Sequence, residues 1–307
     1  MGGKQQKPQR KRKSKQKPPT QASQADIHTL YQSSVQSPDA DCELFAEIYE
    51  QLRGVAPTVL REDFCGTALL STTWCLSDRS RRAIGVDLDA PTLAWARTHN
   101  IEPNAEALGD RLELVQADVL EVQHLERADI SAALNFSFCI FKQRHELLRY
   151  LERSYSGLAE GGVLFLELFG GLKGIDTDEE TRELDGFTYI WEQESFNPIT
   201  NEIVCHIHFE FPDQSRIERA FTYHWRLWSI PELRDLLYEA GFSKVRVYWE
   251  KVEEEDDDDD DDVDDDDDDE IDDDDDDDDM LEGTGEYEEV EEVEQQDSWL
   301  VYVVAQR

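Results

Sequence analysis

The chain has 307 residues and a formal net charge of −42, with 72 Asp and Glu against 30 Lys and Arg. This length allows one large domain or two ordinary ones. Such strong acidity excludes a broad phosphate-binding surface, because nucleic-acid affinity comes largely from Lys and Arg that neutralise phosphates. The sequence also has no stretch of about 20 apolar residues and no apolar secretory signal, so we expect a soluble protein of the cytoplasm or nucleus and no membrane contact.

One strongly basic segment and one strongly acidic segment lie on either side of most of the part that is expected to fold. Residues 1–24 are expected to be a disordered basic arm, because the first 20 carry eight Lys or Arg, no acid and little to bury. Its Arg10–Lys13 cluster is either a nuclear address or a solubilising tail, and any nucleic-acid contact would fall to this arm. Residues 253–297 contain 33 Asp and Glu and no Lys or Arg, which predicts a disordered acidic insertion. This insertion either only solvates the chain or binds a basic partner protein.

Between these segments, 22 basic and 39 acidic residues remain, a net charge of −17 on roughly 240 residues, enough for one well-buried domain. Apolar residues recur at helical spacing from Ala25 to Gly54, and Ser37-Pro38 divides this stretch into two expected helices. Strand and helix patterns then alternate. The expected strands are residues 58–61, 82–86, 112–116, 130–135 and 163–168, and the expected helices are residues 67–76, 91–97 and 144–158. This order predicts an α/β fold with a parallel sheet covered by helices on both faces.

The pattern changes after the fifth strand. Residues 187–195, 202–212 and 216–227 alternate with the two-residue period of half-buried antiparallel strands, so residues 171–228 are expected to form a small inserted antiparallel sheet. A helix at residues 231–240 and strands at residues 245–249 and 299–304 complete the prediction. If those two strands pair as a hairpin, the acidic insertion is a long loop between them, which costs little because closure entropy grows only logarithmically.

The loop after the first strand is where a doubly wound sheet binds its ligand. It reads Arg61-Glu62-Asp63-Phe64-Cys65-Gly66-Thr67-Ala68. A dinucleotide site needs three glycines for close approach to a pyrophosphate, and this loop has one. Its acids would repel a phosphate and attract an ammonium or sulfonium, which favours a phosphate-free cationic cofactor.

Acids also follow the next two strands. Asp87 ends the second strand and is suited to accept hydrogen bonds from a ribose diol, while Asp118 follows the third and is suited to accept from an adenine amino group. Either residue alone is more often a helix cap or a solvated turn residue. Together, behind a strand-to-helix glycine, they predict a site for a nucleoside with a positively charged amino-acid tail.

These loops resemble the class I, Rossmann-like S-adenosylmethionine-dependent methyltransferase family, across residues 25–252 with 298–307. Glu62 and Cys65-Gly66-Thr67 align with the family's acid-x-Gly-x-Gly-x-Gly loop, whereas Phe64 and Ala68 replace the outer glycines. The Glu-Asp-Phe-Cys-Gly-Thr loop is similar to that of one particular branch. The resemblance implies a Rossmann-like seven-stranded mostly parallel sheet with an antiparallel last strand, and S-adenosyl-L-methionine as cofactor.

The resemblance also implies a set of cofactor-binding residues, with Asp87 on the ribose, Asp118 on the adenine, and Asn135 and Phe136 beside the transferred methyl group. The full set is Glu62, Phe64, Cys65, Gly66, Thr67, Asp87, Leu88, Asp118, Val119, Asn135 and Phe136. The inserted sheet would lie on the acceptor side, and Tyr31 and Gln36 could form a lid. The methyl acceptor stays unidentified.

The sequence does not identify a catalytic base. The catalytic residues are therefore unassigned, and the candidates are His206, His208, Tyr223 and His224. His206, His208 and Glu210 share one strand face, but this pattern more often marks a polar sheet face than a metal site. The five cysteines are scattered without CxxC pairing, which suits reduced thiols and no zinc.

Three functions compete at this point. The first is a methyltransferase acting by in-line displacement, in which positioning and water exclusion matter more than covalent catalysis. The second is a nicotinamide-dependent oxidoreductase, against which the missing glycines count. The third is a non-catalytic acidic scaffold or chaperone that binds basic proteins on a degenerate methyltransferase fold.

Overall fold

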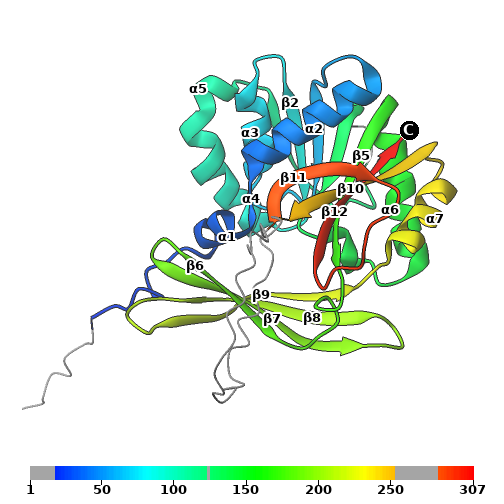
Figure 1. The fold of residues 1–307 in the computed structure, drawn as a ribbon. Coiled ribbons are helices and arrows are strands. Elements are labelled where there is room, and N and C mark those ends of the chain that lie inside the picture. The colour runs from blue at the N-terminus through cyan, green and yellow to red at the C-terminus, as the bar shows by residue number, and fades with distance from the viewer. Residues whose placement is uncertain (1–17, 123–124, 253–282) are drawn as a thin grey trace, which may run out of the picture.

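The computed structural model describes residues 18–122, 125–252 and 283–307. At its centre lies an eight-stranded sheet in the order β11-β10-β12-β5-β4-β1-β2-β3 (Figure 1). The strands are β1 (Val59–Asp63), β2 (Arg82–Asp87), β3 (Leu112–Gln116), β4 (Ala128–Ala133), β5 (Leu158–Gly170), β10 (Lys244–Val252), β11 (Gly283–Val290) and β12 (Trp299–Gln306). β1 pairs in parallel with β2 and β4, and the parallel pairing extends to β3 and β5. The expected mostly parallel, Rossmann-like sheet is confirmed.

At one edge of the sheet, beyond β5, the strands are antiparallel. β12 lies between β5 and β10 and pairs antiparallel with both, as expected for the hairpin of residues 245–249 with 299–304. The predicted count of seven strands is wrong, because β11 adds an eighth strand antiparallel to β10. β11 lies inside the segment predicted to be a disordered acidic insertion, residues 253–297, so that prediction is wrong for residues 283–290. Residues 253–282 lie outside the described residues.

The reason for the additional strand is apolar contact within an acidic sequence. Tyr287 packs against the core on one face of the sheet and Val290 against the core on the other. Lys251 on β10 pairs with Glu286 and Glu288 across the two strands. Two apolar contacts and neutralised glutamates are enough to hold an edge strand whose composition alone favours disorder.

Helices cover both faces of the sheet. They are α1 (Ile27–Val35), α2 (Pro38–Arg53), α3 (Leu69–Ser77), α4 (Ala90–Ala96), α5 (Ala105–Leu108), α6 (Arg144–Gly157) and α7 (Ile230–Ala240), with π- and 3-10 turns over residues 97–104 and 137–140. α2 and α3 bury Phe45 and Trp74 on one face, and α6 and α7 bury Leu147 and Leu236 on the other. The helix ends follow the sequence signals: Pro lies in the first turn of α2, and Gly54 ends that helix with a φ of 72°.

The inserted sheet has four strands in the order β6-β7-β8-β9: β6 (Glu179–Leu184), β7 (Phe187–Asn197), β8 (Glu202–Glu210) and β9 (Arg216–Arg226). The antiparallel insertion after the fifth strand is confirmed, with one strand more than the pattern predicted. β6 reads Glu-Glu-Thr-Arg-Glu-Leu, so its polar, largely exposed residues carry almost no alternation from which a strand can be predicted.

The segment before β1 joins the two sheets. In Figure 1, α1 lies between the α/β unit and the inserted sheet. Residues 18–24, predicted to belong to the disordered basic arm, contact the inserted sheet: Gln21 N donates to the Asp213 carboxylate (2.9 Å) and Ala22 N to Ser215 Oγ (3.0 Å). The prediction of disorder is therefore wrong for residues 18–24, because these backbone donors find acceptors on the insertion. Residues 1–17 lie outside the described residues.

All five cysteines are free and buried, as expected for reduced thiols. Among the described residues, none of the helices combines the length and the apolar character needed to cross a membrane.

Candidate active site

A cavity of about 370 Å³ lies at the carboxyl ends of β1, β2 and β4. The loops after these three strands form one side, and α1 and β9 form the other. Its lining residues are His28, Tyr31, Gln36, Glu62, Asp63, Phe64, Cys65, Gly66, Thr67, Asp87, Asp89, Thr92, Leu134, Asn135, Ser137, Ile140, Phe221, Tyr223 and Trp225. This is the edge of a parallel sheet at which ligands bind in open α/β folds.

The loop after β1 has three residues in the left-handed backbone conformation, of which one is glycine. Phe64, Gly66 and Ala68 have φ values of 60°, 49° and 53°, so all three adopt the left-handed conformation. That conformation costs a residue with a Cβ about 1–2 kcal/mol, and only Gly66 is free of the cost. The Phe64 ring packs near Phe141 and Tyr150, which helps to hold the loop in this path. Phe64 and Ala68, which stand where the family's loop has its outer glycines, thus adopt the backbone conformation that glycine favours.

Asp87 connects this loop to the loop after β2. Its Oδ2 accepts a hydrogen bond from Gly66 N (2.8 Å) and its Oδ1 accepts one from Asp89 N (2.8 Å). The close approach of the two strands depends on Gly85, since a Cβ there would lie 2.9 Å from Cys65 Sγ. The carboxylate of Asp87 is thus held at the mouth of the loop, with lone pairs left to accept from a ligand.

Glu62 and Asp63, the last two residues of β1, are buried and have hydrogen-bond or ion-pair partners within the protein. The Asp63 carboxylate pairs with Arg61 Nε (2.8 Å) and accepts from the Tyr150 hydroxyl (3.2 Å), and both partners of the ion pair are buried. The Glu62 carboxylate accepts from Ser71 N (3.0 Å) at the start of α3, and burial raises its pKa to about 8. At neutral pH much of Glu62 is therefore protonated, so the cavity is less negative than its formal charges suggest.

The loop after β4 carries a second strained stretch. Asn135 and Phe136 have φ values of 49° and 57°, although neither is glycine. Asn135 N donates to the Glu167 carboxylate on β5, and Asn135 Nδ2 donates to Val35 O at the end of α1 (3.1 Å). Burial, with a further contribution from Asp41, raises the pKa of Glu167 to about 8. Strained backbone at two neighbouring strand ends is typical of functional sites.

The structure brings together seven of the eleven residues predicted to bind the cofactor. Those that line the cavity are Glu62, Phe64, Cys65, Gly66, Thr67, Asp87 and Asn135. Leu88, Asp118, Val119 and Phe136 lie outside its lining: Leu88 is 67% exposed, Val119 is buried in the core, and Asp118 Oδ1 accepts from Leu120 N (2.9 Å). Phe136 packs against Phe169 and Trp225 instead.

The opposite wall was only partly foreseen. Tyr31 and Gln36, expected as a lid, do line the cavity, whereas His28 was missed although it lies three residues before Tyr31 on the same helix face. Gln32 Nε2 donates to Thr67 Oγ1 (2.8 Å) and ties α1 to the loop after β1, and Asp26 at the start of α1 accepts from Trp95 Nε1 (2.9 Å) on α4.

The candidate histidines of the insertion lie away from the cavity. Phe221, Tyr223 and Trp225 face it from β9, so the alternate residue His224 and the paired β8 residues His206 and His208 occupy the other face of the inserted sheet. These two β8 rings are buried and bonded to their neighbours, His206 to Thr222 and Glu194, and His208 to Glu218 and Glu192. In the part of the chain that the structure describes, no cluster of His, Cys, Asp or Glu is arranged to hold a metal ion.

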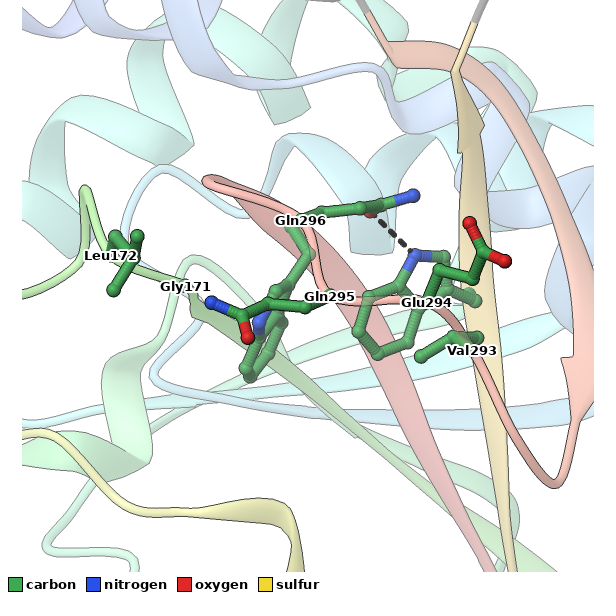
Figure 2. A pocket seen from close by; sticks show the side chains of 8 residues that line it. Gly171, Leu172, Val293, Glu294, Gln295 and Gln296 are labelled. Carbon is green, nitrogen blue, oxygen red and sulfur yellow. Dashed lines mark hydrogen bonds between the residues drawn. The ribbon is translucent and has the colours of Figure 1, made fainter.

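A second cavity of about 360 Å³ lies between the end of β5 and the segment that leads into β12 (Figure 2). Trp249 and Trp299 line it with their rings 5.2 Å apart, and Trp249 Nε1 donates to Gln296 Oε1 (2.9 Å). Glu294 is the one titratable group among its lining residues. It offers far less chemistry than the cavity at the ends of β1, β2 and β4.

No family model matches the chain, and no curated protein matches it. Solved structures do share its fold. A S-adenosylmethionine-dependent methyltransferase from Clostridium acetobutylicum has 15% sequence identity and a TM-score of 0.58, and the match covers 91% of this chain and 95% of that one. DesVI from Streptomyces venezuelae has 18% identity and a TM-score of 0.58, covering 74% and 92%.

A third similar structure is an amino pentose methyltransferase from Micromonospora echinaspora, solved with S-adenosylmethionine bound. It has 16% identity and a TM-score of 0.56, and the match covers 73% of this chain and 90% of that one. At these identities the likeness concerns the fold: the chain has the Rossmann-like fold of S-adenosylmethionine-dependent methyltransferases.

Proposed function

We propose that this protein is a methyltransferase that binds S-adenosyl-L-methionine in the cavity at the ends of β1, β2 and β4 and transfers its methyl group by in-line displacement. The observation that carries the proposal is the hydrogen bond from Gly66 N to Asp87, in a loop where Phe64, Gly66 and Ala68 all adopt the left-handed conformation that favours glycine. The shared fold of solved methyltransferases supports it.

The residues present fit this cofactor. The lining of the cavity, all of it within the described residues, includes no Lys or Arg, which a pyrophosphate would require. Asp87 is suited to a ribose diol, and the backbone of Gly66 and Thr67 leaves room for a ligand, since a Cβ on Gly66 would meet nothing within 4 Å. When bound, the cofactor supplies an electrophilic methyl group on a positively charged sulfur, a charge that the acidic strand-end loops tolerate.

The protein's own contribution is positioning and exclusion of water. Asn135 is held in place by hydrogen bonds to Glu167 and Val35, and it lies on the cavity wall beside Phe136. α1 forms one side of the cavity with β9, against which Tyr31 packs at Phe221, and Gln32 ties it to Thr67 on the strand-end side. Holding two reactants in line in a dry pocket supplies several kcal/mol of a displacement barrier without covalent catalysis.

Calorimetric titration of the full-length protein tests the proposal. We expect binding of S-adenosylmethionine and S-adenosylhomocysteine in the micromolar range, none of NAD, and a loss of roughly 100-fold in affinity in Asp87→Ala, because a charged hydrogen-bond acceptor is removed. Asp118→Ala is the matched control, since Asp118 lies outside the lining, and its affinity should stay within about threefold of the unchanged protein.

Two outcomes would contradict the proposal. An Asp87→Ala variant that binds as tightly as the unchanged protein would remove the residue on which it depends. Binding of neither sulfur compound would favour the acidic scaffold that binds basic proteins, and NAD binding would favour an oxidoreductase.

A further inference from the structure

The cavity between the end of β5 and the segment that leads into β12, which we call the tryptophan cavity, lies apart from the proposed cofactor site. Its volume, about 360 Å³, falls within the range of roughly 300–1,000 Å³ that small-molecule sites occupy. In Figure 2 its labelled lining residues come from two parts of the chain, Gly171 with Leu172 and Val293 through Gln296. Because β4 and β5 run parallel, both cavities lie at the same edge of the large sheet, yet the two described linings share no residue.

Two indole rings line the tryptophan cavity. The ring centroids of Trp249 and Trp299 lie 5.2 Å apart, and the ring planes are 41° from parallel. Trp249 is only 8% exposed, and its Nε1 donates to Gln296 Oε1 (2.9 Å), so its polar group already has a partner. The Trp299 ring packs on Gly170, where a Cβ would overlap it. The protein therefore holds both rings in place, and a ligand meets a preformed aromatic surface.

The surroundings of the tryptophan cavity are acidic. Glu294 is an exposed lining residue, and within the described part of the chain its carboxylate has no hydrogen-bond or ion-pair partner. The segment of residues 291–298 adds three more exposed acids and contains no Lys or Arg. Charge of one sign around a cavity raises the local concentration of oppositely charged ligands, so the tryptophan cavity attracts a cation.

The basic residues that follow its lining residues in the sequence do not offset this charge. Lys251, two residues beyond Trp249 on β10, pairs with two glutamates of β11. The charge of Lys173, next to Leu172, acts on Glu180. Neither lysine belongs to the described lining of the tryptophan cavity.

Two exposed apolar side chains, Leu172 (49% exposed) and Val293 (45% exposed), also line the tryptophan cavity. A cluster of acids alone is usually a solvated surface. Here it accompanies indole rings, whose faces attract a cation, and apolar groups that suit the methylene stem of a basic side chain. Arginine fits this combination better than lysine, because its planar guanidinium stacks on aromatic rings and donates two parallel hydrogen bonds to a carboxylate.

We infer that the tryptophan cavity binds an arginine side chain from a basic protein segment. The guanidinium lies against the pair of Trp249 and Trp299 and donates to the Glu294 carboxylate. The methylene stem packs against Leu172 and Val293. This assignment makes the end of β5 and the segment before β12 an interaction surface for an arginine-containing partner, and it does not depend on the proposed function, because the cofactor is no part of the site.

Nuclear magnetic resonance of the full-length protein with ¹⁵N-labelled tryptophan tests the inference, because each of the seven indole N–H groups gives one signal. The probe is the amide of N-acetylarginine, which resembles an arginine within a peptide, at about 0.15 M salt to screen exposed charges. We expect the signals of Trp249 and Trp299 to shift together as the probe binds, and that of Trp225, which lines the other cavity, to stay in place. The citrulline amide, which has nearly the same shape and no charge, should bind at least about tenfold more weakly, and the lysine amide about threefold more weakly.

Three variants locate the contact. Glu294→Gln should lower the affinity for the probe about threefold, because a carboxylate partner is lost. Glu292→Gln is the matched control, since it removes the same charge from the same segment outside the lining, and its affinity should stay within about 1.5-fold of the unchanged protein. Trp299→Leu should lower the affinity at least about tenfold, read from the Trp249 signal. Because Glu294 is exposed, its variant tests the contact even if Trp299→Leu fails to fold.

The inference is overturned if neither tryptophan signal shifts, if the citrulline amide binds as tightly, or if Glu294→Gln and Glu292→Gln have equal effects. A shift of the same two signals by maltotriose, a neutral sugar, would indicate a carbohydrate site and would also overturn it. Removal of residues 1–17, which include Arg10 and Arg12, should leave the affinity for the probe unchanged. A rise in affinity would show that the chain's own arm competes for the tryptophan cavity, which would overturn the assignment to a partner.

Discussion

The two sides of the cavity at the ends of β1, β2 and β4 are built in opposite ways. The strand-end side consists of backbone turns under strain and of buried charges, with Phe64, Ala68, Asn135 and Phe136 in the left-handed region and the Arg61–Asp63 pair sealed beneath them. The opposite side, the aromatic wall, consists of the rings of Tyr31 on α1 and of Phe221, Tyr223 and Trp225 on β9, which pack as in an ordinary core. The first side is costly to fold and the second stabilises the fold, and strain of the first kind is characteristic of functional sites.

The largest expected effect on the free energy of unfolding comes from removing the buried ion pair between Arg61 and Asp63. Arg61→Met should lower the free energy of unfolding by about 3–5 kcal/mol and the Tm by roughly 10 °C, because the Asp63 carboxylate would stay buried with only the Tyr150 hydroxyl as partner. Thermal and denaturant unfolding measure both quantities.

The exposed pair Arg82–Glu126, at 3.5 Å, provides the control. Arg82→Met should change the free energy of unfolding by less than about 0.5 kcal/mol, because solvent screens an exposed pair. Equal effects of the two variants would show that burial does not distinguish the two ion pairs.

A second, smaller effect is a pH dependence that comes from Glu167. Its pKa in the folded protein, about 8, lies above the ordinary value near 4.5, so the folded state binds the proton more tightly than the unfolded chain does. Its contribution is therefore fully favourable below pH 4.5 and is lost as the pH rises toward 8. Glu167→Gln should become more stable relative to the unchanged protein between pH 5 and pH 8, by on the order of 1–3 kcal/mol.

Denaturant unfolding at the two pH values measures this difference, and the exposed Glu160→Gln is the control that should show none. Part of the dependence should remain in Glu167→Gln, since Glu62 also has a pKa raised to about 8 by burial. A Glu167→Gln variant whose advantage shrinks as the pH rises would contradict the assignment.

The smallest expected effect on the free energy of unfolding is the difference between alanine-to-glycine substitutions on the two sides of the cavity. Ala68→Gly should leave the free energy of unfolding within about 0.5 kcal/mol, because relief of a left-handed backbone offsets the lost methyl group and the gain in unfolded-state entropy. Ala220→Gly, on β9 beside the bulge at Arg219 but itself outside the left-handed region, should cost about 1 kcal/mol. Chemical denaturation measures both, and equal losses would show that the strain at Ala68 is negligible.

The contrast between the two sides also explains what could be predicted from the sequence. The sequence signal for each strand-end loop is contained in neighbouring residues. Gly66 and Asp87 each follow an apolar run, and the alternation of strands and helices places both residues at one edge of the sheet. Residues that depend on the exact course of a loop were less predictable. Leu88, Asp118 and Val119 follow strands as Asp87 does, yet they lie outside the cavity lining.

The aromatic wall is formed by residues that lie far apart in the sequence. Tyr31 meets Phe221 only because α1 packs against the inserted sheet, and no pattern in either segment predicts this contact. The same limit applies to His206 and His208, since alternation shows that they share a face but not which face is turned to the cavity. β11 was missed for a different reason: its glutamates dominate the composition, while Tyr287 and Val290 make the contacts that hold it.

The position of β12 has a consequence for the order in which the molecule is assembled. Along the chain β12 follows the other seven strands of the large sheet, yet it lies in the interior of that sheet, between β5 and β10. During synthesis those two strands therefore wait with unpaired edges until residues 299–306 leave the ribosome. At about 5–20 residues per second, the stretch from Val252 to Trp299 delays closure by several seconds. A chain cut before Trp299 should therefore be left with a divided sheet, in which β5 and β10 have no strand between them.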